Sequence, residues 1–149
     1  MTAAPRNATF DFPAPHVIEL TVQADDIDAY EHVNNAVYLA WFDRVAWSHS
    51  AALGVPLEEC VRMRRGMAAL RTEIEFARAA RCGERVQVAT WIAASDGRLR
   101  VARRFQVRRA ADGVTLARAL TDYVCINLDS GRATRMPKLF RCAYVVTKS

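Results

Sequence analysis

The sequence of 149 residues contains few of the side chains that build metal and redox centres. Its three histidines are scattered, and its four cysteines form no Cys-x-x-Cys pair and no metal-site spacing. Only two of the 21 basic residues are lysines, and the basic residues form neither a block of five nor an alternation with aromatic residues. We therefore expect reduced thiols, no metal, no cofactor and no nucleic-acid partner.

Long apolar segments and glycine-rich phosphate motifs are also missing. No run of about 18 apolar residues suggests a membrane span, and the first 15 residues lack the apolar core of a signal peptide. The patterns GxGxxG and GxxxxGK[ST] are absent, which excludes dinucleotide-fold and P-loop proteins. A soluble cytoplasmic protein without a membrane partner is expected, and its net charge of +5 can attract an anionic ligand.

The composition is that of one globular domain. Apolar residues make up 52% of the chain and charged residues 25%, close to the average of folded proteins, and this length supports one core. Three of the five prolines lie in residues 1–15, which are predicted to form a flexible arm. Residues 16–149 are predicted to form a single domain.

One segment is predicted to be a long helix. The Asn34-Asn35 pair offers a cap for a helix over residues 36–53, and Gly54 followed by Pro56 provides the stop. Between Ala36 and Trp47 only two residues are charged, so this helix has hardly a polar face. We therefore expect other parts of the structure to wrap it.

Downstream, apolar and polar residues alternate with the period of strands. Strands are expected at residues 16–22, 70–76, 85–92, 99–108 and 113–128. Asp96-Gly97 and Asp112-Gly113 fit tight hairpin turns that require positive φ. The prediction is an α+β fold in which a five- or six-strand antiparallel sheet surrounds the central helix.

The stretch before the helix, DDIDAYEHVNNAVYLAWFDR, has a distinctive order of polar residues. Asp26-Ile27-Asp28, His32-Val33-Asn34-Asn35 and Tyr38 resemble the D-x-D-x-x-x-H-V-N-N-x-x-Y pattern of hotdog-fold acyl-CoA thioesterases of the 4-hydroxybenzoyl-CoA thioesterase type. The resemblance covers roughly residues 16–137 and is most specific in this motif. It implies the hotdog fold for residues 16–149, acyl-CoA as substrate and hydrolysis to the free acid and CoA.

The resemblance also assigns roles. It implies that Asp28 is the catalytic carboxylate, that the main-chain N–H of Asn35 polarises the thioester carbonyl, and that His32, Asn34 and Tyr38 contribute to substrate binding. It further implies a homodimer or homotetramer with the pocket between subunits. Many members of the family have glycine at the position of Glu31, so the loop over residues 29–34 is expected to differ in shape.

Physical chemistry supports the same arrangement. A helix N-terminus presents unpaired N–H donors and a partial positive charge, which suits an oxygen that gains negative charge during attack on a thioester. A carboxylate nearby can act as nucleophile or as base for water. The sequence does not separate these two roles.

Several alternatives remain at this stage. Asp43, on the helix itself, is the rival acid, because other hotdog thioesterases carry theirs there; otherwise it is expected to pair with an arginine, Arg44 or one from a strand. Arg103, on the apolar face of a strand, is expected either to have a carboxylate nearby, with Asp43 as a candidate, or to lie at a subunit interface. The CoA phosphates have four candidate ligands: Arg78, Arg81, Arg100 and Arg104. The alternative functions are a thioesterase acting on acyl carrier protein and a non-catalytic acyl-CoA-binding module; a dehydratase is disfavoured because no paired Asp and His is evident.

Overall fold

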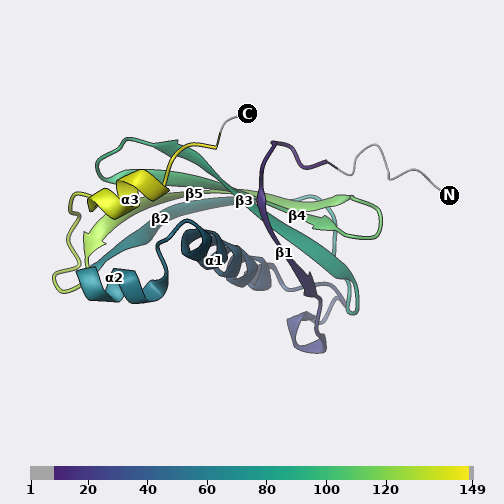
Figure 1. Ribbon diagram of the computed structural model, residues 1–149. Helices are drawn as coiled ribbons and strands as arrows, with labels where there is room; N and C mark the ends of the chain where they lie inside the picture. Colours follow the sequence, from purple (N-terminus) through teal and green to yellow (C-terminus); the bar gives the residue numbers. More distant parts are fainter. Residues whose placement is uncertain (1–8, 148–149) are drawn as a thin grey trace.

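The computed structural model describes residues 9–147 and has one long helix lying against a five-stranded antiparallel sheet (Figure 1). The strands are β1 (His16–Thr21), β2 (Arg65–Phe76), β3 (Arg85–Ser95), β4 (Arg100–Arg109) and β5 (Thr115–Asn127), in the order β1-β3-β4-β5-β2. The helices are α1 (Asn35–Ala52), α2 (Leu57–Met63) and α3 (Lys138–Ala143), with a short 3-10 turn η1 (Ala24–Asp26) before α1. The predicted α+β hotdog class is confirmed, with five strands.

The turns of the meander form where the sequence indicates. Gly97 lies between β3 and β4 with φ of 68°, and Gly113 lies between β4 and β5 with φ of 72°. The carboxylate of Asp96 accepts hydrogen bonds from three successive backbone N–H groups. These aspartate-glycine pairs therefore fix the register of three consecutive strands.

Helix α1 begins and ends within one residue of the predicted positions. The Asn34 side chain accepts a hydrogen bond from the Ala36 N–H at 2.9 Å, so it caps the first turn. Gly54 follows the last turn with φ of 92°, in the left-handed region that favours glycine. The cap places Asn35 as the first helical residue.

Only one side of α1 is buried. Tyr38, Trp41, Phe42 and Val45 pack against the sheet, and Phe42 stacks on Phe105 of β4 with ring centroids 4.8 Å apart. The opposite side is open and still partly apolar: Leu39 is 48% and Trp47 41% exposed. The predicted sheet around the central helix is therefore confirmed for one side of α1, and the described residues leave the other side uncovered.

The two edges of the sheet differ in length and polarity. Strand β1 has six residues, whereas β2 has twelve and, within the part of the chain that the structure describes, pairs only with β5. Two large apolar side chains of β2 are exposed, Leu70 by 52% and Phe76 by 45%. A long edge strand with exposed apolar residues is a natural surface for pairing with another chain.

Part of the predicted N-terminal arm covers the face of the sheet away from α1. Within residues 9–15, Phe12 meets Trp91 of β3 edge-on at 5.7 Å, and the Arg104 guanidinium lies 4.9 Å from the Phe12 ring centre. Trp91 donates a hydrogen bond to the Pro13 carbonyl. Residues 1–8 of the predicted flexible arm lie outside the described residues.

Candidate active site

The D-x-D segment and the His-Val-Asn-Asn segment form one tight loop before α1. Ile27 and Val33 make an antiparallel bridge, and the Asp28 N–H donates to the His32 carbonyl at 2.9 Å. The Asn34 N–H donates to the Asp26 carbonyl at 2.8 Å. These bonds close one loop, which carries the half-buried Asp28 and leads directly into α1.

Glu31 holds the tip of this loop in an unusual conformation. Its φ is 63°, in the left-handed region that non-glycine residues rarely adopt. Its N–H donates to the Asp28 carbonyl at 3.0 Å, and the Asp28 carboxylate accepts from the Tyr30 N–H at 2.8 Å. The chain thus folds a glutamate into the conformation that a glycine adopts more easily.

The start of α1 leaves a hydrogen-bond donor available. Asn34 occupies the cap position, so the Asn35 N–H is one of the first-turn donors that lack an acceptor within the helix. Among residues 9–147, no acceptor for the Asn35 N–H is found. This donor and the partial positive charge of the helix start are therefore available to an oxygen beside the Asp28 loop.

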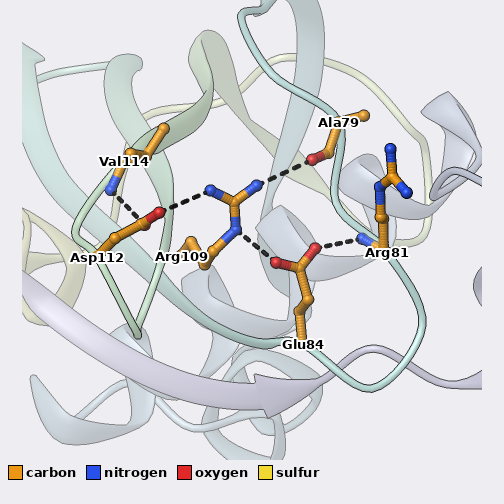
Figure 2. A network of polar contacts seen from close by, with 6 residues as sticks. All are labelled: Ala79, Arg81, Glu84, Arg109, Asp112 and Val114. Atoms are coloured by element: carbon orange, nitrogen blue, oxygen red, sulfur yellow. Dashed lines mark hydrogen bonds and ion pairs between the residues drawn. The ribbon is translucent and has the colours of Figure 1, made fainter.

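A second loop, residues 77–84, supports the first. The Ala80 carbonyl accepts from the Val33 N–H at 2.9 Å. An ionic network holds this loop, as Figure 2 shows: Arg109 binds both Glu84 and Asp112, and the Arg81 N–H donates to Glu84. The Glu84 and Arg109 side chains are only 25% and 23% exposed, so solvent screens this pair incompletely.

The other predicted residues occupy different places. Tyr38 is 2% exposed and contacts Trp41 and Phe76 edge-on, which places it in the core beneath the loop. Burial raises its pKa, so the phenol is neutral. His32 is half-buried, and Asp43 lies two turns into α1 rather than at its start. Asn34 serves as the cap, and its contact with substrate stays a prediction.

The four candidate arginines separate into two groups. Arg78 and Arg81 are exposed on the loop that contacts Val33. Arg104 lies on the opposite face of the sheet, over Phe12, and strand alternation places Arg100 on the same outer face. Only Arg78 and Arg81 are therefore near the candidate active site.

Sequence reasoning did not foresee a second polar region at the other end of α1. It is a pocket of about 80 Å³, here called the Arg103 pocket, between α1 and strands β2, β4 and β5. The polar residues that line it are Asp43, Ser50, Arg103, Tyr123 and Tyr144. The position of Arg103 on an apolar strand face was the only sequence signal for it.

Among the described residues no carboxylate pairs with Arg103. Arg103 is 4% exposed; it donates to His49 Nδ1 at 2.7 Å and to Ser50 Oγ at 2.8 Å, and Ser50 in turn binds the Tyr144 hydroxyl at 2.9 Å. The ion pairs among residues 9–147 include none to Arg103. Of the two alternatives for Arg103, pairing with Asp43 is therefore not found among residues 9–147, and a subunit interface stays a prediction.

Histidines beside Arg103 are neutral. Burial first, then the Arg103 charge and His16, lower the pKa of His49 to about 4. Burial and Arg103 also lower the pKa of His16, whose ring stacks on His49 at 5.0 Å. Because an arginine only donates, His49 Nδ1 must accept, which leaves its proton on Nε2.

Within residues 9–147, no three metal-binding side chains come together, and no helix has the length and apolar character to cross a membrane. The free cysteines are Cys60, Cys82, Cys125 and Cys142, of which Cys60 and Cys125 are buried.

Comparison with solved structures shows the same fold repeatedly. A 1,4-dihydroxy-2-naphthoyl-CoA thioesterase from Synechocystis is 22% identical with a TM-score of 0.79 and covers 88% of this chain and 96% of its own. A hypothetical protein from Thermus thermophilus is 25% identical with a TM-score of 0.80, covering 89% and 99%. A Staphylococcus aureus protein in complex with CoA is 20% identical with a TM-score of 0.79, covering 85% and 79%.

No curated protein sequence matches the chain. The family comparison is decisive instead, because it matches residues 22–143, which include the loop, α1 and the whole sheet except β1. The predicted enzyme class, a thioester hydrolase, is confirmed by this match. The chain belongs to the thioesterase-like superfamily.

Proposed function

We propose that this enzyme hydrolyses acyl-CoA thioesters at the start of α1, with the Asp28 carboxylate and the Asn35 N–H as its catalytic groups. The observation that carries the proposal is the available N–H at a capped helix start beside a loop that holds a half-buried carboxylate. Such a donor stabilises negative charge on an oxygen. No metal is needed for this chemistry.

The reaction follows from these two groups. Either Asp28 or a water that it deprotonates attacks the carbonyl carbon of the thioester, which forms a C–O bond and an oxyanion. The Asn35 N–H donates to that oxyanion. Collapse of the intermediate breaks the C–S bond and releases CoA as the thiol; on the nucleophile route, water then hydrolyses the anhydride that links the acyl group to Asp28.

Two further features fit a CoA substrate. Arg78 and Arg81 are exposed beside the Asp28 loop and can bind the phosphates of CoA. His32 is half-buried in the loop between Asp28 and Asn35, where a substrate contact with its ring is expected. The CoA-bound Staphylococcus aureus protein of the same fold supports this class of ligand.

The active form is proposed to be a homodimer, which can assemble further into a homotetramer. The open edge of β2 and the apolar side of α1 lie together in one chain, with Leu39, Trp47 and Leu70 exposed. Pairing of two β2 strands around a two-fold axis joins the sheets and lays the two α1 helices side by side in opposite directions. Each helix start then lies beside the second half of the partner helix.

The test compares the two candidate acids. Free thiol release is measured from short, long and aromatic acyl-CoAs, and from the same acyl groups on acyl carrier protein, for the wild type, Asp28→Asn and Asp43→Asn. We expect Asp28→Asn to lose about 10²-fold or more in kcat and to keep its fold and substrate affinity, with a much smaller effect of Asp43→Asn.

Each other outcome points to a specific alternative. Wild type that binds acyl-CoA without releasing thiol from any substrate indicates a binding module. Activity confined to acyl carrier protein, with strong salt dependence, indicates the protein-bound substrate. Full activity of Asp28→Asn with loss in Asp43→Asn moves the chemistry to the helix.

A further inference from the structure

The Arg103 pocket contains a positive charge that no acid of the described chain pairs with. The guanidinium is nearly excluded from water, and its hydrogen-bond partners, His49, Ser50 and Tyr144, are all uncharged groups. The cost of burying a charge is large unless an opposite charge or many hydrogen bonds compensate it. Neutral acceptors compensate only part of that cost.

The groups around Arg103 are arranged to stay neutral. His49 and His16 are both neutral at pH 7 because burial and Arg103 disfavour their protonated forms. Tyr123 and Tyr144 are neutral as well, since burial raises the pKa of both. The Tyr144 ring centre lies 5.6 Å from the guanidinium carbon. The region therefore retains one uncompensated positive charge.

Asp43 does not remove this imbalance. It lines the same pocket, but it is exposed and forms no ion pair among residues 9–147. Water screens an exposed carboxylate, whereas the buried guanidinium acts through a medium of low dielectric constant. An anion inside the pocket therefore gains more from Arg103 than it loses to Asp43.

We propose that the Arg103 pocket binds a carboxylate, and that this carboxylate is a second acid group on the acyl chain of the substrate. A guanidinium matches a carboxylate through two parallel hydrogen bonds, more closely than it matches any neutral group. The substrate class is then a monothioester of a dicarboxylic acid with CoA. The assignment to the acyl chain rests on the proposed function, whereas carboxylate binding does not.

The length of α1 decides whether one substrate can contact both the helix start and the Arg103 pocket, and it favours contact across two subunits. From Asn35 to Ser50 the helix rises about 22 Å at 1.5 Å per residue, which is too far for a short acyl group within one chain. In the proposed dimer the helices run in opposite directions, so the second half of one lies beside the start of the other. A thioester at one helix start can then place its far end in the pocket of the other subunit.

The experiment compares carboxyacyl-CoAs with their primary-amide analogues, which have nearly the same shape and no charge. A series of increasing chain length and a carboxybenzoyl-CoA are assayed by thiol release. The variants are Arg103→Gln and Arg103→Lys. Arg103→Gln keeps a donor for His49, and Arg103→Lys keeps the positive charge without the parallel N–H donors of a guanidinium. Arg104→Gln is the matched control, because the neighbouring side chain lies on the outer face of the same strand.

We expect the wild type and Arg104→Gln to prefer the carboxylate over the amide by about 10- to 100-fold in kcat/KM, the range of a charge-assisted hydrogen bond. In Arg103→Gln the preference should disappear, because kcat/KM for the carboxylate falls to that for the amide, and Arg103→Lys should keep part of the preference. Thiol release from both substrate types without any preference overturns the substrate assignment and leaves the proposed function intact.

A binding measurement without CoA distinguishes a carboxylate on the acyl chain of the substrate from a free carboxylic acid as the ligand of the pocket. Free dicarboxylates are added to each variant, and the shift in Tm is measured. A rise in Tm with wild type but not with Arg103→Gln, combined with no preference among the acyl-CoAs, assigns the pocket to a free acid and overturns the acyl-chain source. No shift and no preference overturn carboxylate binding altogether, whether or not thiol is released.

Discussion

The two ends of α1 differ in how their charge is provided. At the start, the positive character comes from the backbone, the carboxylate is half-buried, and both belong to one short loop. In the second half, the positive charge is the Arg103 side chain, which is nearly fully buried among residues from separate elements. Under the two proposals made above, local sequence builds the catalytic groups and long-range packing builds the recognition of the acyl group.

The largest expected effect on activity comes from breaking the proposed dimer, which separates the helix start of one subunit from the Arg103 pocket of the other. Leu70→Asp introduces a carboxylate on the open edge of β2, where burial of a charge costs about 3 kcal/mol or more, or about 10²-fold in Kd. Sedimentation should show dissociation, and activity should fall in parallel. Val17→Asp on the opposite edge strand β1 is the control, and an equal effect of both variants contradicts an interface at β2.

A second prediction concerns the neutral histidine in the Arg103 pocket. The pKa of His49 is about 4 in the folded protein and near its usual value of 6.5 in the unfolded chain. Between these values the unfolded state binds more protons, so stability must fall as the pH is lowered from 7 toward 4.

Thermal unfolding between pH 7 and pH 5 measures this effect. His49→Gln keeps an oxygen that can accept from Arg103, and its Tm should change less over this range than that of wild type. Some dependence should remain, because burial also lowers the pKa of His16. Identical pH profiles for the two proteins contradict a neutral, half-buried His49.

Removal of the Asn34 cap at the start of α1 is predicted to have a smaller effect, on the free energy of unfolding. Asn34→Ala removes the side chain that accepts from the Ala36 N–H and should lower the free energy of unfolding by about 1 kcal/mol. Asn34→Asp keeps the acceptor and should retain the stability. Denaturant unfolding compares the three proteins; an Asn34→Ala variant as stable as wild type contradicts the capping role.

The smallest predicted effect is at Glu31. Glu31→Gly relieves the left-handed conformation of the loop tip, with φ of 63°, but makes the unfolded chain more flexible. The two terms leave a net gain of less than about 1 kcal/mol. The same unfolding measurement tests it, and a clear loss of stability indicates that the Glu31 side chain makes contacts that the backbone geometry does not explain.

The comparison between the two ends also explains how much the sequence predicts. The cap at Asn34 and the start of α1 are local features, so capping and stop signals suffice to predict them, whereas the Asp28 loop was predicted from the resemblance of its motif to a family pattern. Helices α2 and α3 were not predicted, because seven and six residues are too few for a clear periodicity. The residues of the Arg103 pocket lie far apart in sequence, so no spacing rule brings them together.

Two expectations were met only in part, for related reasons. The apolar pattern of α1 predicted that other structure covers the helix, but the pattern does not say whether the covering surface belongs to the same chain. The position of Arg103 predicted a buried charge correctly, but its partner was expected to be an acid or a second subunit, whereas the described chain supplies His49 and Ser50. In both cases the pattern indicated burial and left the neighbour unspecified.

The most direct test of the central claim removes one backbone donor. Asn35 is the first residue of α1, where proline fits the helix, and Asn34 has the extended backbone, φ −60° and ψ 136°, that a residue before proline requires. Asn35→Pro should therefore fold normally and lower kcat by about 10²- to 10³-fold, while Asn35→Ala, which keeps the N–H, stays close to wild type. A folded Asn35→Pro variant with wild-type kcat would contradict the role of the helix start in catalysis.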